Sequence, residues 1–282
     1  MFGDWVKLAR LSNAVTAGAG VWLGHACLYY LGRAGSGPFP WEAATFGSAA
    51  MAALAAAGNM QNDALDVEAD RINRPERAIP SGRVARGDVV RASLGLYVLA
   101  ILLGFSLGRY EGFLTVSMGS LLWMYNLKLK ALPLWGNLAV AALCALAVYF
   151  PEVPHSPDFT AFPALFAFLT TLAREVAKDA EDMAGDAAIG YSTFPLRFGE
   201  KATKRVVAGI CIVVILLLPV PWLHLGYHAG YPILAALVVL PLMATIIAAV
   251  VRPGTHWREV QKRLKWVMLA GMIAVLAGVF RG

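Results

Sequence analysis

Charged residues are scarce in this chain. Asp, Glu, Lys and Arg make up 15% of the 282 residues, whereas hydrophobic residues make up 59% and the mean hydropathy is +0.62. Soluble globular domains carry about 25% charged residues. The composition therefore excludes an ordinary soluble domain and indicates a chain that lies largely within a membrane.

Cysteine is also scarce. Cys27, Cys144 and Cys211 are the three cysteines, and each lies inside an apolar segment at a spacing unrelated to the others. This excludes a disulfide framework and a zinc-binding pattern. A cleavable signal is not expected either, because Asp4 lies in the charged start and the apolar run that follows is too long.

The apolar residues fall into nine blocks long enough to cross a hydrocarbon core about 30 Å thick. The predicted spans are 12–32, 41–59, 92–109, 112–127, 133–150, 159–176, 205–225, 230–251 and 264–280. The second is rich in Ala and Gly, which favours close packing against other helices over contact with lipid. We expect an all-α polytopic membrane protein: one domain over 1–282, with nine transmembrane helices around a central cavity open to the cytoplasmic side.

The charges indicate an orientation. If the N-terminus and the loops at 60–91, 128–130, 174–205 and 252–265 share one side, that side holds all of the 24 Lys and Arg residues except Arg33, Arg109 and Arg281. Such a bias predicts a cell-membrane protein with that side in the cytoplasm. The net charge of +6 is then explained by topology and membrane lipids. No nucleic acid partner is expected.

The spacing D-x-x-D-x-x-x-D occurs twice, each time at the cytoplasmic end of a predicted span. The first copy is Asp63, Asp66 and Asp70, and the second is Asp179, Asp182 and Asp186. On continuous helices, Asn62, Asp66 and Asp70 would share one face, and Glu175 would extend the stripe of the second copy. The first helix must end before Pro75.

Two facing carboxylate stripes favour a magnesium site. Mg²⁺ takes oxygen ligands and commonly binds through one or two carboxylates plus substrate phosphate oxygens. The oxygen donors of the two stripes are Asn62, Asp66 and Asp70 in the first copy and Asp179, Asp182 and Asp186 in the second. The site would then hold a diphosphate.

Nearby cations suit the remaining phosphate oxygens. The candidates for substrate binding are Arg71, Arg74, Lys178 and Arg83, with Arg77 close by. Tyr125, Lys128 and Lys130 follow the fourth span on the same side and add a phenol and two ammonium groups.

Other interpretations stay open at this point. Acidic loops with interspersed basic residues are often solvated, salt-bridged connectors, and Tyr125 could be a membrane-interface tyrosine. Intramembrane acids also mark the ion pathways of cation or substrate transporters, although transporters place them near the bilayer midplane. A CDP-alcohol phosphotransferase is excluded because its D-G-x-x-A-R signature is absent.

The two loops resemble those of the UbiA superfamily of intramembrane prenyltransferases. The similarity rests on N-D-x-x-D-x-x-x-D-R-x-x-R-P-x-R-x-I-P-S-G from Asn62 and on D-x-x-D-x-x-x-D from Asp179. The nine-helix layout extends it over nearly the whole chain. Ala78 departs from the Pro of many relatives, which should alter loop stiffness without removing a ligand.

The resemblance implies a membrane-embedded transferase with Mg²⁺ as cofactor and a prenyl diphosphate as donor. Its metal ligands would be Asn62, Asp66, Asp70, Asp182 and Asp186, with Asp179 beside them. Its catalytic residues would be Asp66, Asp182, Tyr125 and a lysine, either Lys128 or Lys130. R-E-x-x-K-D-x-x-D-x-x-G-D and the later S-T-F-P are most similar to a branch that transfers a geranylgeranyl group to geranylgeranylglyceryl phosphate, forming an ether lipid. An aromatic acceptor or chlorophyllide is the alternative, because enzymes for those acceptors share parts of the second motif.

Overall fold

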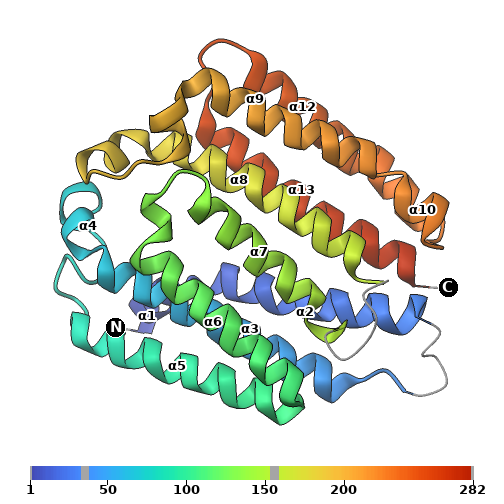
Figure 1. The fold of residues 1–282 in the computed structure, drawn as a ribbon, viewed down its shortest axis with the longest axis horizontal. Helices are drawn as coiled ribbons and strands as arrows, with labels where there is room; N and C mark the ends of the chain where they lie inside the picture. The colour runs from blue at the N-terminus through green and yellow to red at the C-terminus, as the bar shows by residue number, and fades with distance from the viewer. Residues whose placement is uncertain (1, 33–37, 153–158, 281–282) are drawn as a thin grey trace.

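The computed structural model describes residues 2–32, 38–152 and 159–280, and within them the chain is helical without a strand (Figure 1). The helices are α1 (Phe2–Ala9), α2 (Leu11–Leu31), α3 (Trp41–Leu65), α4 (Val67–Asn73), α5 (Arg86–Leu107), α6 (Arg109–Leu127), α7 (Trp135–Tyr149), α8 (Ala161–Ala188), α9 (Phe194–Leu217), α10 (Val220–His224), α11 (Gly230–Leu234), α12 (Leu240–Val251) and α13 (Trp257–Val279). Short 3-10 turns occupy Leu129–Ala131 and Phe150–Glu152, and a π-helical turn, Ala235–Val239, joins α11 to α12.

Each of the nine predicted apolar segments coincides with a helix or with joined helices. Three of the described helical segments are long and apolar enough to cross a membrane by length and composition alone: Arg86–Leu107, Phe194–His224 and Gly230–Val251. The helix at Trp135–Tyr149 is apolar but shorter. Several of the others end in polar or charged residues, as α3 and α8 do with their aspartates. The helical segmentation is confirmed, and the count of nine membrane crossings stays a prediction.

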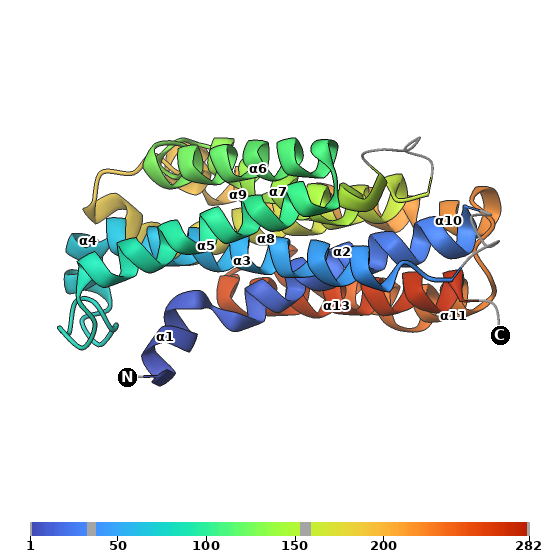
Figure 2. The same cartoon turned by 90° about the horizontal axis from the view of Figure 1, so that it is seen from below.

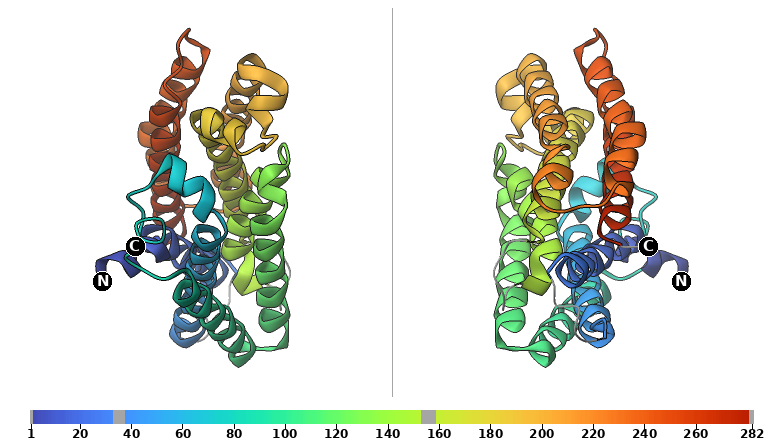
Figure 3. Two further views of the ribbon diagram at one scale, coloured as in Figure 1. Left: turned by 90° about the vertical axis from the view of Figure 1, so that its left-hand side faces the viewer. Right: turned by 90° about the vertical axis from the view of Figure 1, so that its right-hand side faces the viewer.

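The long helices form a closed ring. Neighbours in contact are, in order, α2, α3, α5, α6, α7, α8, α9, α12 and α13, and α13 returns to α2. Additional contacts of α2 with α7 and of α8 with α13 cross the ring. Figure 3 shows the bundle from the left-hand and right-hand sides of Figure 1.

Helix α2 lies between two apolar cores. Its Leu23, Ala26 and Cys27 belong to a cluster with α8, α9, α11, α12 and α13, whereas its Val21 belongs to a cluster with α3, α5, α6 and α7. A third, smaller cluster packs Leu8 of α1 against the end of α3 and the 78–89 segment. The end of the bundle that carries the acidic motifs therefore has a core of its own.

The bundle has two chemically distinct ends. Helices α1 and α4 and the α8–α9 connection lie at one end, and α10, α11 and the last turn of α13 lie at the other (Figures 1 and 2). Both acidic motifs are therefore at the α1 end. Of the three cations assigned by the sequence to the opposite side, Arg109 begins α6, whereas Arg33 and Arg281 lie outside the described residues.

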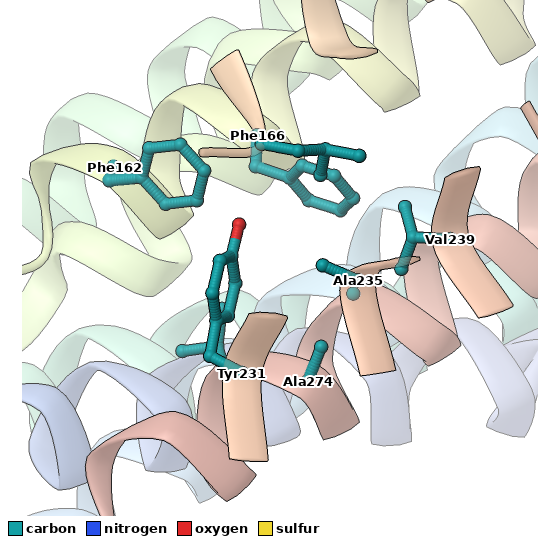
Figure 4. A pocket seen from close by; sticks show the side chains of 9 residues that line it. Phe162, Phe166, Tyr231, Ala235, Val239 and Ala274 are labelled. Atoms are coloured by element: carbon teal, nitrogen blue, oxygen red, sulfur yellow. The ribbon is translucent and has the colours of Figure 1, made fainter. Parts of the chain in front are cut away.

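A small apolar cavity lies away from these motifs, between α8, α9, α11 and α13 (Figure 4). The hydroxyl group of Tyr231 points into it between Phe162 and Phe166. The ring of Phe166 also occupies the place that a side chain at Gly271 would need. This cavity is not the central cavity open to the cytoplasmic side that the sequence predicts, and that cavity stays a prediction.

The contact between α2 and α7 depends on a glycine. A Cβ atom at Gly24 would lie 2.1 Å from the carbonyl oxygen of Val148 and 3.0 Å from the ring of Pro151. Backbone atoms cannot move aside as a flexible side chain can. The close approach of the helices at the centre of the ring is therefore possible only with glycine at this position.

We predict that Gly24→Ala lowers the free energy of unfolding by about 1–3 kcal/mol, the usual cost of overpacking. Gly95→Ala on α5 is the matched control, because a Cβ atom there has no neighbour within 4 Å. That control should be neutral or slightly stabilising through helix propensity. Thermal unfolding in detergent tests both variants, and equal midpoints would contradict the close contact.

Candidate active site

The first acidic motif follows one helical path with a bend in it. Helix α3 ends at Leu65, α4 begins at Val67, and Asp66 between them has φ −89° and ψ 13°. The backbone hydrogen bonds continue across this bend, since the Asp66 amide donates to the Asn62 carbonyl at 2.9 Å and the Asp70 amide donates to the Asp66 carbonyl at 2.8 Å. Helix α4 ends at Asn73, so the predicted stop before Pro75 is confirmed.

Two aspartates of the first motif are held by arginines. Arg77 donates to Asp70 at 2.6 Å and lies 3.4 Å from Asp63, while Arg10 donates to Asp63 at 2.7 Å. Asp63 and Asp70 are both 7% exposed. Charge-assisted hydrogen bonds of this kind suit buried carboxylates, and they fix the loop after α4 against the start of α2.

The second motif lies on α8, close to its carboxyl end. Asp179 accepts a hydrogen bond of 2.8 Å from the side chain of Asn137, in the first turn of α7. Asp182 lies 3.5 Å from Arg74, which follows α4. The Arg74–Asp182 ion pair therefore joins the segment just after the first acidic motif to the second motif.

The same end of the ring brings further charges together. Lys130 forms an ion pair with Asp66. The charges of Asp66 and Asp182 act on Asp186, and the charges of Asp66 and Asp179 act on Tyr125. Tyr125 is partly buried and lies close enough to Asp66 and Asp179 for their charges to act on it, and its role stays a prediction.

The structure separates the two lysines that the sequence leaves open. Lys130 is mostly buried and pairs with Asp66, whereas Lys128 is exposed. Two contacts hold the connector between α6 and α7, which contains the 3-10 turn Leu129–Ala131. Gly136 approaches the Lys130 backbone closely, and the Ser192 amide donates a 3.0 Å hydrogen bond to the Ala131 carbonyl. Of the two lysines, Lys130 therefore faces the acidic motifs.

Burial raises the pKa of several of these carboxyl groups, all beyond the predicted spans. It raises the pKa of Asp179 to about 7, with the charge of Glu175 contributing. It raises the pKa of Asp186 to about 6, with the charge of Asp182 contributing, and the pKa of Asp70 is also raised by burial. Crowded carboxylates with raised pKa values are typical of a site that binds a cation.

The donor set fits magnesium better than a softer metal, because every candidate ligand offers oxygen. Within the described residues, no three His, Cys, Asp or Glu side chains stand close enough to hold a metal ion by themselves. Mg²⁺ seldom needs such a cage, since it binds through one or two carboxylates and takes its remaining ligands from phosphate and water. Asn62, Asp66, Asp179, Asp182 and Asp186 are the side chains that would hold it, whereas the sixth predicted ligand, Asp70, is paired with Arg77.

The four predicted phosphate-binding cations lie in different surroundings. Arg74 contacts Asp182, and Lys178 lies 4.0 Å from the buried Glu175. Arg71 pairs with exposed Glu68 at 2.9 Å, and Arg83 pairs with Asp4 at 3.1 Å. The structure thus brings Arg74 and Lys178 to the acidic motifs and does not bring Arg71 or Arg83 there. All four roles stay predictions.

Sequence reasoning missed three side chains that hold the motifs. These are Arg10 on Asp63, Asn126 on Asn62 and Asn137 on Asp179. Arg10 links α1 to α2 in a left-handed conformation with φ 46°. Asn126 follows Tyr125 directly, so its position in the polar element after the fourth span was an available signal.

The fold and the site together define a class: an all-helical membrane protein with two aspartate motifs meeting at one end of a helical ring. The chain belongs to the UbiA prenyltransferase family, whose family model matches residues 21–275. It is therefore a membrane protein and a prenyltransferase.

Individual relatives extend over nearly the whole chain. A digeranylgeranylglyceryl phosphate synthase from Methanopyrus kandleri is 34% identical over 98% of both chains. A solved structure from work on digeranylgeranylglyceryl phosphate synthase in membranes is 25% identical and has a TM-score of 0.76, covering 99% of this chain and 98% of that one. A UbiA homolog from Archaeoglobus fulgidus, solved with GPP and Mg²⁺, has a TM-score of 0.68 at 13% identity, with 96% and 99% of the two chains covered.

We predict that Lys130→Met lowers the rate of prenyl transfer at least about a hundredfold, the usual cost of losing one charge-stabilising group at a reacting oxygen. Lys128→Met is the matched control and should stay within a few-fold of the wild type, because its side chain points to solvent. Initial rates with saturating Mg²⁺ measure both. Equal losses in the two variants would contradict the assignment of Lys130.

We also predict that the half-saturating Mg²⁺ concentration rises as pH falls from 8 to 6. Raised carboxyl pKa values mean that the proton competes with the metal, and each displaced proton costs about tenfold in affinity per pH unit below the pKa. The groups concerned are Asp179, with a pKa of about 7, and Asp186, with a pKa of about 6.

Asp179→Asn should make this pH dependence shallower, because it removes the carboxyl group that titrates first. Magnesium titrations of activity at fixed pH values measure the effect. A half-saturating concentration that stays constant from pH 8 to 6 would show that these carboxylates do not bind the metal.

Proposed function

We propose that the protein transfers a geranylgeranyl group from geranylgeranyl diphosphate to geranylgeranylglyceryl phosphate, in a Mg²⁺-dependent reaction that forms an ether lipid and releases diphosphate. The observation that carries the proposal is that two D-x-x-D-x-x-x-D motifs, from α3–α4 and from α8, lie at one end of the bundle, where Arg74 pairs with Asp182 and Lys130 pairs with Asp66. The relatives named for this synthase, matched over almost their full length, support the choice of acceptor.

The charged side chains at the two motifs determine how the diphosphate group of the prenyl donor would bind. Magnesium held by Asn62 and Asp66 on one side and by Asp182 and Asp186 on the other would neutralise charge that develops on the departing diphosphate. Lys130 and Arg74 already lie against these carboxylates, so their cationic groups would donate to the phosphate oxygens that remain. The reactive carbon would then lie on the inner side of the carboxylates, near Tyr125.

The reaction would proceed by ionisation. The bond between C1 of the prenyl chain and the diphosphate oxygen breaks, and both electrons leave with the diphosphate. The Tyr125 phenol, among the carboxylates, would face the positive charge left on the allylic carbon, which an aromatic ring stabilises. The acceptor hydroxyl forms the new C–O bond and its proton leaves with the diphosphate, so that no covalent enzyme intermediate is required.

The proposed orientation follows the charges. All nine apolar segments would cross the cell membrane, with α1, α4 and the acidic motifs on the cytoplasmic side and the end of α13 outside. A cavity open at the motif end would admit both substrates, and the isoprenoid chains would extend between apolar helices. The exposed large hydrophobic residues on α5, α9 and α12 fit contact with lipid, as Leu102, Leu216 and Val251 illustrate.

The test is prenyl transfer by the purified protein in detergent, with labelled geranylgeranyl diphosphate, Mg²⁺ and a choice of acceptors. Geranylgeranylglyceryl phosphate should give a labelled diether that disappears when EDTA is added. Transfer to homogentisate alone would keep the family mechanism and refute the acceptor. No product with any acceptor, from a folded protein, would refute the enzyme and favour a transporter.

In the same assay, Asp66→Ala and Asp182→Ala should each lower turnover by at least about 10²–10³-fold, since each removes charge that stabilises the transition state. Asp88→Ala is the matched control. Asp88 is an exposed aspartate at the same end of the bundle and pairs with its neighbour Arg91, so its loss should leave turnover unchanged. Near-wild-type turnover in either motif variant would remove that motif from the mechanism.

A further inference from the structure

A buried asparagine outside the acidic motifs contacts the amide of Asn62. Asn126, near the end of α6, is 2% exposed and has three hydrogen-bond partners. Its Nδ2 donates to the Gly58 carbonyl at 3.0 Å and to Oε1 of Gln61 at 2.9 Å. Its Oδ1 accepts from Nδ2 of Asn62 at 3.3 Å. Asn62 itself is one of the ligands required by the proposed function.

The Gly58 carbonyl oxygen determines which group donates and which accepts in these hydrogen bonds. A backbone carbonyl can only accept, so the group of Asn126 that faces Gly58 must be its NH₂. The Oδ1 of Asn126 is then on the opposite side and can only accept. Asn62 must therefore present its own NH₂ to Asn126, which leaves Oδ1 of Asn62 directed away from this contact.

Two further buried side chains fix the orientation of Asn126. Oε1 of Gln61 accepts from Asn126 and also accepts from the Tyr97 hydroxyl at 2.8 Å. Gln61 and Tyr97 are both 7% exposed. Turning the Asn126 amide over would place its oxygen against two acceptors, the Gly58 carbonyl and Gln61. The chain from Tyr97 through Gln61 and Asn126 thus has one satisfied arrangement.

We propose that Asn126 is a positioning residue which, supported by Gln61 and Tyr97, holds the Asn62 amide with its oxygen toward the metal. The reason is chemical, since Mg²⁺ binds the oxygen of an amide and not its nitrogen. If the Asn62 amide turned over, it would present two N–H groups to the cation. An aspartate needs no such control, because both of its terminal atoms are oxygen. Among the residues that the structure describes, Asp66 accordingly has Lys130 as a charge partner and no comparable relay.

The test measures Mg²⁺ binding without turnover. The half-saturating Mg²⁺ concentration is read from thermal stabilisation of the detergent-purified protein with a non-reactive thiolo analogue of geranylgeranyl diphosphate. Asn126→Ala should raise this concentration about tenfold, a typical effect of losing a group that orients a metal ligand. Asn126→Ser serves as a second variant if the alanine variant does not fold, because a hydroxyl can donate or accept and so imposes no direction.

A rescue variant and a control variant distinguish the positioning role of Asn126 from a purely structural one. Asn62→Asp presents oxygen in either orientation, so the tenfold effect of Asn126→Ala should fall below about twofold when residue 62 is Asp. Ser93→Ala is the matched control. Ser93 is 2% exposed and donates to the Ala57 carbonyl at 2.8 Å, so its loss also removes a buried hydrogen bond to α3 and should leave Mg²⁺ binding unchanged.

The outcomes are distinct. An effect of Asn126→Ala that is absent, or equally large with Asn62 and with Asp at position 62, overturns the proposal. An equal effect of Ser93→Ala does the same. Asp66→Ala, measured in parallel, tests the proposed function. If this variant binds Mg²⁺ as the wild type does, the proposed metal site is wrong. If Asp66→Ala loses Mg²⁺ binding and Asn126→Ala does not, only the role of Asn126 is refuted.

Discussion

The requirement to balance negative charge at one end of the helical ring shapes this structure. Carboxylates from α3, α4 and α8 lie close together, and burial disfavours their charged form, as the raised pKa values of Asp179 and Asp186 show. Cations from distant parts of the chain compensate: Arg10 and Arg77 at the first motif, Arg74 between the motifs, and Lys130 at Asp66. A polar cluster of this kind is stable only if each charged group has a partner, so it requires the helices to meet in one arrangement.

The ring of helices provides that arrangement. Helix α2 contributes to both apolar cores, and its glycine at position 24 allows α7 to approach it closely. Helix α7 begins with the segment that carries Asn137, and the connector before it carries Lys130. Packing in the middle of the bundle thereby fixes the position of two polar side chains at its end, one for each acidic motif.

Much of this organisation was predictable from sequence. Apolar segments are long and separated by polar loops, so the nine long helical segments that the structure describes between α2 and α13 followed from hydropathy, and Pro75 marked the end of the polar helix α4. The repeated aspartate spacing identified the site, because carboxylates are energetically costly near a membrane and a second copy of the same spacing indicates a shared function. The chain belongs to the family that these motifs resemble.

The partners of the motif residues were not predictable, because they depend on contacts between distant segments. Arg10 and Asp63 are separated by 53 positions, and Asn137 and Asp179 by 42. No local pattern marks such pairs. The choice between Lys128 and Lys130 likewise required the 3-10 turn Leu129–Ala131, which directs one lysine inward and leaves the other in solvent.

The central claim is that both acidic motifs hold one diphosphate through metal ions. The most direct measurement is the anomalous scattering of Mn²⁺, used in place of Mg²⁺, in crystals of the protein with the thiolo analogue of the donor. We expect manganese peaks on both sides of the diphosphate, one beside Asn62 and Asp66 and one beside Asp182 and Asp186. Metal at only one motif, or diphosphate bound without metal at either, would contradict the account.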